Sequence, residues 1–321
     1  MSAFKWQKLG RVFDPRDYPG RPWLHEFAQA PATLIRDDFV RVYFSCRPAP
    51  DENGQYVSRS AWVDLDRGDL TRVLRVADEP VLSLGGLGTF DEFGTYPFSA
   101  IDDGGRVLGY YAGWTRCESV PFNTAIGCAQ SFDGGATFSR LGAGPVIGYS
   151  PDEPFVMSGP KIRRWDDEFH LFYIAGRRWK DVDGRPEPVY CIRRATSLDG
   201  INWTKHNQDL IAPRIEDDEA QASPDVFRKD GWYHMFFCYR HSEGFRTAER
   251  GYRIGYAVSK DLTTWHRDDA AAGIEPSAEG WDSGSISYPH VFELDGDTYL
   301  AYLGDGVGRY GFGLARLEEG P

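Results

Sequence analysis

One sequence plan recurs five times along the 321-residue chain and constrains the fold more than any other feature. Each copy has a proline, a short apolar run, a tight polar turn, and a return run that alternates aromatic and aliphatic residues. The prolines are separated by 66, 63, 64 and 65 residues, and they are Pro31, Pro97, Pro160, Pro224 and Pro289. A regular period of this length through the whole chain is typical of an architecture built from repeated units.

Each repeat has the pattern of four antiparallel strands. The proline is expected at the start of the first strand, where a missing N–H does least harm. Turns such as "DDGG", "KDGW" and "LDGD" predict a hairpin to the second strand. A third strand ends near an alanine, and in three repeats a Ser-x-Asp turn leads to a fourth strand at Phe138, Trp203 or Trp265. Four-stranded units without helical periodicity predict the blades of a β-propeller.

The two ends of the chain extend this prediction. The last repeat stops at "GFGLARLEEGP" without a fourth strand, whereas "KWQKLGRVFDP" precedes the first repeat and resembles the missing strand. The N-terminal strand is therefore expected to complete the last blade and to remove an exposed sheet edge. We predict an all-β fold, in which residues 1–321 form one five-bladed β-propeller domain with four-stranded antiparallel blades.

Composition and charge exclude several classes of function. The formal net charge is −12, which argues against a nucleic-acid or anionic-membrane surface. No apolar run approaches the roughly 18 residues of a membrane span, and the N-terminus has no apolar signal segment. The five cysteines lack metal-ligand spacing and are expected to be mostly buried, reduced thiols, so the chain is predicted to be cytoplasmic. They are Cys46, Cys117, Cys128, Cys191 and Cys238.

The predicted topology brings charged loops to one face of the ring. The loop entering the first strand of each blade and the loop joining its second and third strands emerge on that face. The entering loops are acidic, and they carry Glu26, Asp91, Glu92, Asp152, Glu153, Glu219 and Asp282. The second strands end in arginines, which are Arg47, Arg116, Arg177, Arg178 and Arg240, with Arg309 slightly later. A residue that recurs in every blade is first a feature of the fold, and exposed ion pairs contribute only about 0–1 kcal/mol each.

Positions that break the repeat symmetry are stronger candidates for function. Directly after the repeat prolines, three neighbouring blades carry Lys161, Asp225 and His290, whereas the other two carry Ala32 and Phe98. The long loops between the second and third strands of repeats three and four also break the symmetry, and such loops are usually functional. These two loops hold the candidates Arg178, Glu187, Tyr190, Arg193, Arg240 and Arg253. Aromatic residues near the same rim could stack on sugar rings, and they include Tyr96, Trp114, Trp179 and Tyr288.

Three blade motifs carry a resemblance to a known superfamily: "YPVF"-like inner strands, "A-x-S-x-D-G-x-x-W" and "GWDS…YP". Over its whole length the sequence resembles the five-bladed glycosidase-like propellers, which include arabinanases, xylosidases, invertases, levansucrases and mannoside phosphorylases. It is most similar to glycosidase-related propellers found with polysaccharide-biosynthesis genes and to the propeller domain of the plant glucosamine inositolphosphorylceramide transferase. The superfamily's catalytic motifs do not carry over. Ala30 precedes Pro31 where arabinanases have an aspartate, the Asn-Asp-Pro element is absent, and the fourth repeat has no Glu-Gly-Pro motif, although Glu219 lies five residues before Pro224.

The resemblance and the charged rim predict an enzyme that cleaves or transfers a glycosidic bond. Glycoside hydrolysis needs a protonated carboxyl group and a second carboxylate, about 5 or 6.5–9.5 Å apart. Burial and neighbouring carboxylates raise the pKa of such an acid. We predict Glu219 as the acid and Asp91 or Asp225 as its partner. The full pool of catalytic candidates is Asp91, Glu153, Glu187, Glu219, Asp225 and Asp282.

The arginines refine the predicted substrate to a saccharide that carries an anionic group, because guanidinium groups match carboxylate and phosphate oxygens. The predicted binding residues are Arg47, Arg116, Arg178, Tyr190, Arg193, Arg240, Arg253 and His290. Two alternatives stay open. One is a glycosyltransferase or phosphorylase that uses a sugar phosphate or nucleotide-sugar, and the other is a non-catalytic module that binds a glycan or a protein. No metal or other cofactor is predicted, since one histidine is more often hydrogen-bonded in a core than a ligand.

Overall fold

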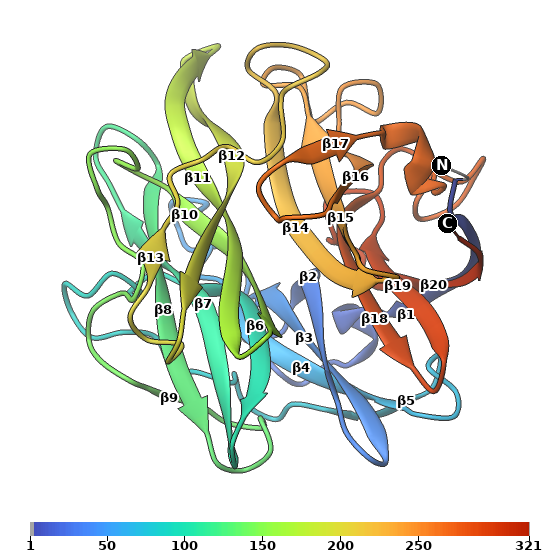
Figure 1. Cartoon of the computed structure of the whole chain (residues 1–321). Coiled ribbons are helices and arrows are strands. Elements are labelled where there is room, and N and C mark those ends of the chain that lie inside the picture. The colour runs from blue at the N-terminus through green and yellow to red at the C-terminus, as the bar shows by residue number, and fades with distance from the viewer. Residues whose placement is uncertain (1–2, 321) are drawn as a thin grey trace.

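The computed structural model describes residues 3–320. They form five four-stranded antiparallel sheets arranged as a ring (Figure 1). The first four blades follow chain order. Blade one consists of β2 (Glu26–Ile35), β3 (Phe39–Arg47), β4 (Arg59–Asp66) and β5 (Val73–Val76), and blade two of β6 (Thr95–Asp103), β7 (Arg106–Arg116), β8 (Phe122–Ser131) and β9 (Ser139–Arg140). Blade three consists of β10 (Met157–Trp165), β11 (Glu168–Val182), β12 (Arg185–Ser197) and β13 (Thr204–Lys205). Blade four consists of β14 (Ala220–Lys229), β15 (Trp232–Arg240), β16 (Arg253–Ser259) and β17 (Trp265–Arg267).

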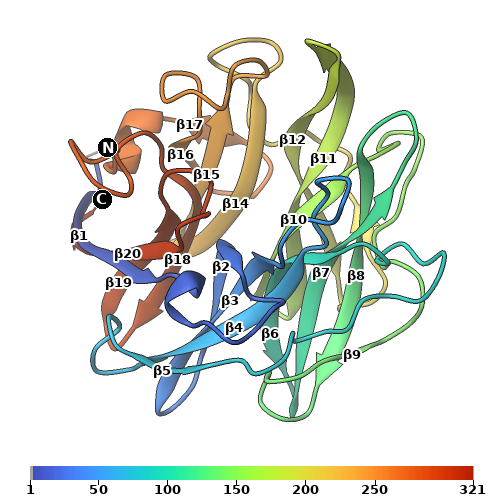
Figure 2. The same cartoon turned by 180° about the vertical axis from the view of Figure 1, so that it is seen from behind.

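The fifth blade joins the two ends of the chain, as predicted. Its strands are β18 (Ser287–Leu294), β19 (Asp297–Leu303), β20 (Phe312–Glu319) and β1 (Lys5–Phe13). β1 pairs antiparallel with the outer side of β20, so the N- and C-termini lie side by side at this blade (Figures 1 and 2). The indole Nε1 of Trp6 in β1 donates a hydrogen bond to the carbonyl of Ala272, 2.9 Å away, in the short 3-10 helix η2 (Asp269–Ala272). A second 3-10 helix, η1 (Pro15–Asp17), follows β1.

The repeat prolines lie inside the inner strands and not at their starts, which corrects one expectation. In all five blades the pairing register between the first and second strands shifts at the proline, for example between Gln29 and Ala32 and between Ser287 and His290. A β-bulge leaves a residue unpaired, so a residue without an N–H is tolerated there. Each bulge therefore separates inner-strand residues near the mouth of the ring from those farther along the axis.

Contacts between neighbouring blades explain why the turn motif recurs. In the Ser-x-Asp turns, the Asp199 carboxylate accepts backbone N–H bonds from Ile201 and Asn202, and these bonds hold its pKa well below the ordinary value. The buried hydroxyl of Tyr110, in the preceding blade, donates to the carbonyl of Gly200 over 2.8 Å. Gly200 has a φ of +73°, and a Cβ there would lie 2.7 Å from this hydroxyl, so the turn requires glycine.

All five cysteines are free thiols, and four of them are buried, as expected, whereas Cys117 is exposed. None of the helices among residues 3–320 has the length and apolar character needed to cross a bilayer.

Candidate functional site

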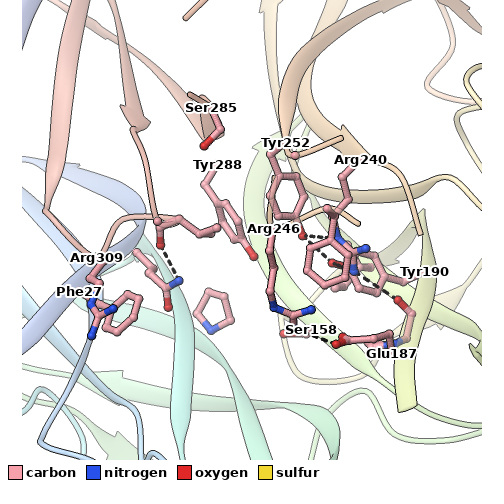
Figure 3. A pocket seen from close by; sticks show the side chains of 18 of the residues that line it. Phe27, Ser158, Glu187, Tyr190, Arg240, Arg246, Tyr252, Ser285, Tyr288 and Arg309 are labelled. Carbon is pink, nitrogen blue, oxygen red and sulfur yellow. Dashed lines mark hydrogen bonds and ion pairs between the residues drawn. The ribbon is translucent and has the colours of Figure 1, made fainter. Parts of the chain in front are cut away.

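A pocket of about 750 Å³ opens on the predicted face of the ring, and residues from all five blades line it. The entering sides of the inner strands contribute Gln29, Tyr96, Ser158 and Tyr288. The second-strand ends and the loops after them contribute Arg47, Trp114, Arg240, Phe245, Arg246, Tyr252 and Asp305. In blade three the long loop expected from the sequence is an extension of β11 and β12, and β12 contributes Glu187 and Tyr190. Figure 3 shows side chains from these opposite sides of the ring pointing toward one hollow. The topology therefore brings the two predicted loop classes together.

Positive charge predominates in the pocket, although the whole protein has a formal charge of −12. Five arginines line it, against two carboxylates among the described lining residues. The arginines are Arg47, Arg185, Arg240, Arg246 and Arg309, and the carboxylates are Glu187 and Asp305. An acidic protein thus carries a local cationic site, which favours an anionic ligand by Coulomb attraction.

Two of these arginines have no carboxylate partner among residues 3–320. Arg240 is 3% exposed, and its guanidinium donates to the hydroxyls of Tyr190 and Tyr252, at 3.3 and 3.2 Å, and to the carbonyl of His241 at 2.8 Å. Half-buried Arg47 donates through Nη2 to Gln29 and to the hydroxyl of Tyr96, and its buried Nε has no hydrogen-bond partner. A buried cation without a counter-ion is costly, so both guanidiniums are suited to an anion that enters the pocket.

The other three pocket arginines are already paired. Arg309 Nε lies 2.9 Å from Glu26 Oε2. Arg246 and Arg185 both contact Oε1 of Glu187, at 2.8 and 3.1 Å, and Figure 3 shows the Arg246 contact. Glu187 is 8% exposed. Two guanidiniums therefore contact one oxygen of this buried carboxylate, which serves as their common acceptor.

Aromatic rings form much of the pocket wall. The rings of Tyr96 and Trp114 are stacked with centroids 4.8 Å apart at 6°, and Phe122 lies 4.4 Å from Trp114. On the opposite side the hydroxyls of Tyr190 and Tyr252 are 2.6 Å apart, and burial raises the pKa of Tyr252 well above its ordinary value. Flat aromatic faces beside hydrogen-bonding groups are a common surface for the apolar faces and hydroxyls of sugar rings.

Four of the predicted catalytic carboxylates lie inside the blades and do not line the pocket. Each contacts a cation on the fourth strand of its own blade, and we call these pairs the blade braces. They are Asp91–Arg140 at 2.6 Å, Glu153–Lys205 at 2.8 Å, Glu219–Arg267 at 2.6 Å and Asp282–Lys8 at 2.7 Å. In three blades a buried second-strand tyrosine also donates to the acid, and these are Tyr111, Tyr173 and Tyr302.

Glu219, the predicted acid, shows what the blade braces do. Its Oε2 accepts the backbone N–H groups of Arg214 and Ile215, at 3.0 and 3.1 Å, while Oε1 contacts Arg267. The carboxylate is therefore occupied in fixing the entering loop to the fourth strand. Recurrence in four blades with the same kind of partner identifies this acid position as part of the blade architecture.

Asp225, Lys161 and His290 meet near the ring axis, one step beyond the bulges. Oδ2 of Asp225 is 2.6 Å from His290 Nδ1, the Lys161 Nζ is 3.3 Å from the same nitrogen, and Arg163 pairs with the other oxygen of Asp225. Burial lowers the pKa of His290 to about 4 and that of Lys161 to about 8. The neutral imidazole then donates from Nδ1 to Asp225 and accepts the Thr33 N–H at Nε2, 2.9 Å away.

This axial cluster belongs to a different cavity. His290, Thr33 and Arg163 line a space of about 290 Å³ together with Trp165 and Phe227, which follow the bulges along the inner strands. The cluster therefore does not supply the main pocket with a carboxylate or an imidazole. Among residues 3–320, no group of three or more His, Cys, Asp or Glu side chains is placed to hold a metal ion.

The remaining predicted binding residues divide between the pocket rim and the surface. Arg116 contacts Asp51 at 2.8 Å beside the pocket. Arg178 is exposed and pairs with Asp218. Arg193 is held by Glu153 and Asp209 inside blade three. Arg253 donates to the carbonyls of Tyr252, Gly284 and Ala248 and so fixes loops behind the pocket wall.

The sequence prediction missed Asp305, the second pocket carboxylate. Its Oδ1 accepts the backbone N–H groups of Gly284 and Ser285, each at 2.8 Å. It follows the second strand of blade five, at the position where the other blades carry arginines. That break in the repeat was the signal that could have identified it. Phe27, Phe245 and Tyr252 also line the pocket and were not predicted.

Sequence comparison finds close relatives but no matching family model. "Uncharacterized protein Rv1502" and "Uncharacterized protein MT1551", from two Mycobacterium tuberculosis strains (ATCC 25618 / H37Rv and CDC 1551 / Oshkosh), are each 35% identical to this protein over 315 residues. The match covers 98% of this protein and 99% of each relative.

Solved structures with the same fold are more distant in sequence. A structure described as "Glycoside hydrolase" has a TM-score of 0.76 at 17% identity, and a BT0996 RGII complex has 0.73 at 17%; both matches cover 98% of this protein and 92% of the other. A structure from work on "the GH130 family of mannoside phosphorylases" has 0.69 at 14%, covering 98% and 94%. The predicted resemblance to the glycosidase-like five-bladed propellers is thus confirmed at the level of the fold.

Proposed function

This protein belongs to the family of the Mycobacterium tuberculosis protein Rv1502, and on that premise, together with the fold and the pocket, we propose that it is a carbohydrate-active enzyme. In this proposal it transfers a glycosyl group from a saccharide whose anionic group, a phosphate ester at the anomeric carbon, is held by the pocket arginines. The acceptor is the hydroxyl group of a second saccharide.

The observation that carries this proposal is the pair of arginines without carboxylate partners, Arg47 and Arg240. They lie on different blades and line one pocket, together with the stacked rings of Tyr96 and Trp114. A ligand with an anionic group beside a sugar ring matches both features, since the anion compensates the guanidiniums and the ring packs on aromatic faces.

Transfer fits the carboxylates better than hydrolysis does. Hydrolysis by two carboxyl groups needs one of them protonated, to donate to the leaving oxygen. Glu187 is ion-paired to Arg246 and Arg185, and Asp305 accepts two backbone N–H groups, so both carboxylates face hydrogen-bond donors and neither is placed to donate to a leaving oxygen. A phosphate leaving group needs no proton, because guanidinium groups can stabilise the charge that develops on it.

In the proposed reaction the bond from the anomeric carbon to the phosphate oxygen breaks, and its electron pair leaves with the phosphate. The acceptor oxygen bonds to the anomeric carbon, and its proton passes to a carboxylate, for which Glu187 is the candidate general base. Arg47 and Arg240 hold the departing phosphate. A second candidate function is non-catalytic glycan binding, which the double pairing of Glu187 favours.

The test compares variants that each remove one charged group from the pocket. Arg47→Met and Arg240→Met are expected to weaken binding of a sugar 1-phosphate by about 10–100-fold, or about 1.4–2.7 kcal/mol, and to leave neutral sugars unaffected in calorimetry. Glu187→Gln is expected to bind the sugar 1-phosphate as the wild type does and to lose at least 100-fold in transfer rate. Retained phosphate binding in both arginine variants would contradict the proposal. Binding without turnover in the wild-type protein would favour the non-catalytic module.

A further inference from the structure

The main pocket continues into a second cavity, which we call the annex. The annex has a volume of about 290 Å³ and lies over the second-strand ends of blades one and two. It shares six lining residues with the main pocket, namely Arg47, Tyr96, Trp114, Phe122, Arg185 and Glu187. Gln55, Tyr56, Phe93 and Arg116 line the annex but not the main pocket. The two cavities therefore meet at one shared boundary.

The boundary carries unpaired positive charge. Arg47 lines both cavities, and its guanidinium lies 4.2 Å from the ring centre of Phe27 and 4.9 Å from that of Tyr56. Stacking fixes the guanidinium plane at the boundary while its Nε keeps no hydrogen-bond partner. An anion bound to Arg47 would thus lie between the cavities and not at the far end of either.

The annex has the walls of a site for a ring-shaped group. Tyr56 and Phe93 add to the shared rings of Tyr96, Trp114 and Phe122. Phe93 is half-buried, and Arg116 stacks over its ring with the guanidinium carbon 4.6 Å from the ring centre. The lining of the annex within residues 3–320 contains three arginines, with Glu187 as its carboxylate. Aromatic faces and excess positive charge suit a flat ring attached to a phosphate.

From this arrangement we propose that the protein takes a two-part ligand, in which phosphate joins a sugar in the main pocket to a second ring in the annex. The inference rests on the proposed function and deepens it, because the annex then holds the remainder of the leaving group. The shared chemistry is a glycosyl phosphoester whose phosphate lies at Arg47. The second ring comes from a nucleoside, as in a nucleoside diphosphate sugar, or from another sugar, as in a sugar–phosphate–sugar diester.

The experiment measures affinity for three ligands: a sugar 1-phosphate, a nucleoside diphosphate sugar, and a sugar–phosphate–sugar diester. We expect at least one two-part ligand to bind 10-fold or more tightly than the sugar 1-phosphate, and which one does so identifies the source of the second ring. Gln55→Trp should fill the annex from an exposed position and abolish this gain, while sugar 1-phosphate binding stays within twofold. Phe93→Ala removes one wall and should reduce the gain.

Phe132→Ala is the matched control, because Phe132 is 74% exposed and lies in an outer turn of blade two. It should leave all three affinities unchanged. Equal affinities for the three ligands in the wild type, or a gain that survives in both annex variants, would overturn the annex proposal alone, provided that sugar 1-phosphate still binds through Arg47. Failure of every phosphate ligand to bind would overturn the proposed function as well.

Discussion

In the interior of blade three, the buried carboxylate of Glu153 lies 2.8 Å from Lys205 Nζ and accepts the hydroxyl of Tyr173 at 2.8 Å. In the pocket, Arg240 is equally buried but has tyrosine hydroxyls and carbonyls as partners and no carboxylate among the described residues. Glu153 lies in the loop before β10 and Arg240 ends β15, and both positions are on the same face of the ring. The buried charge of Glu153 is therefore compensated by a cation of the protein, whereas that of Arg240 has no such counter-ion and is available to an anionic ligand.

The presence or absence of an oppositely charged partner distinguishes structural from functional charged residues more reliably than residue type does. The blade braces recur in four blades with the same kinds of partner, so they contribute to folding wherever they occur. Arg47 and Arg240 stand at recurring positions too, but their surroundings differ from those of Arg116 and Arg178, which are paired with aspartates. A charge without a counter-ion in a cavity lowers the stability of the fold, and such a charge is typical of sites where a bound ligand supplies the counter-ion.

The largest expected effect comes from breaking a blade brace. Glu153→Leu leaves Lys205 and Tyr173 without their buried acceptor, and we expect the free energy of unfolding to fall by about 3–5 kcal/mol. Urea titration monitored by tryptophan fluorescence measures it. The double variant Glu153→Leu/Lys205→Met removes both charges and should recover part of the loss, because Arg193 keeps its contact with Asp209 at 2.9 Å. A loss below 1 kcal/mol in the single variant would remove the distinction between brace and pocket.

The fold was predictable from the sequence because the repeat is geometric: evenly spaced prolines and polar turns required five similar blades and an N-terminal strand to close the last one. The side-chain directions were not predictable. The period assigns Glu219 and Glu187 to loops on the same face, yet Glu219 turns inward to Arg267, and Glu187 lines the pocket. That choice depends on fourth-strand cations that are distant in sequence, 48 residues away for Glu219 and 274 residues away for Asp282.

The bulge at each repeat proline is a second physical reason why the sequence did not predict where side chains lie. Lys161, Asp225 and His290 follow the bulges along the inner strands, whereas the spacing predicts only that they occupy equivalent inner-strand positions. A strand pattern of period two contains no sign of an extra residue until the partner strand is known. The spacing therefore indicates that these three residues are equivalent in the repeat, but it does not show that His290 lines a cavity separate from the main pocket.

The next largest effect is expected in the axial cluster of Asp225, Lys161 and His290, where the free energy of unfolding should depend on pH. Burial holds the pKa of His290 at about 4, whereas the unfolded chain takes up this proton near pH 6.5. As pH falls from 7 to 5, protonation therefore favours the unfolded chain, and His290 should contribute a loss of about 2 kcal/mol. His290→Gln should lose this part of the pH dependence in urea titrations at the two pH values.

The exposed residue His266 provides the matched control for that experiment. His266→Gln should keep the full wild-type difference between pH 7 and pH 5, since its imidazole is in solvent in both states. Identical pH dependence in wild type and His290→Gln would mean that the axial imidazole takes up its proton equally easily in the folded chain. The cluster would then be hydrated and not a compensated, dry contact.

The smallest effect is expected at Arg178, which sequence reasoning placed with Arg240 among the binding residues. Its side chain is 58% exposed and its guanidinium pairs with Asp218, and such a pair contributes about 0–1 kcal/mol. Arg178→Ala should change the free energy of unfolding by less than about 0.5 kcal/mol and sugar 1-phosphate affinity by less than twofold in calorimetry. A tenfold loss of affinity would show that exposed rim arginines also hold the ligand, and that absence of a carboxylate partner does not mark the binding residues.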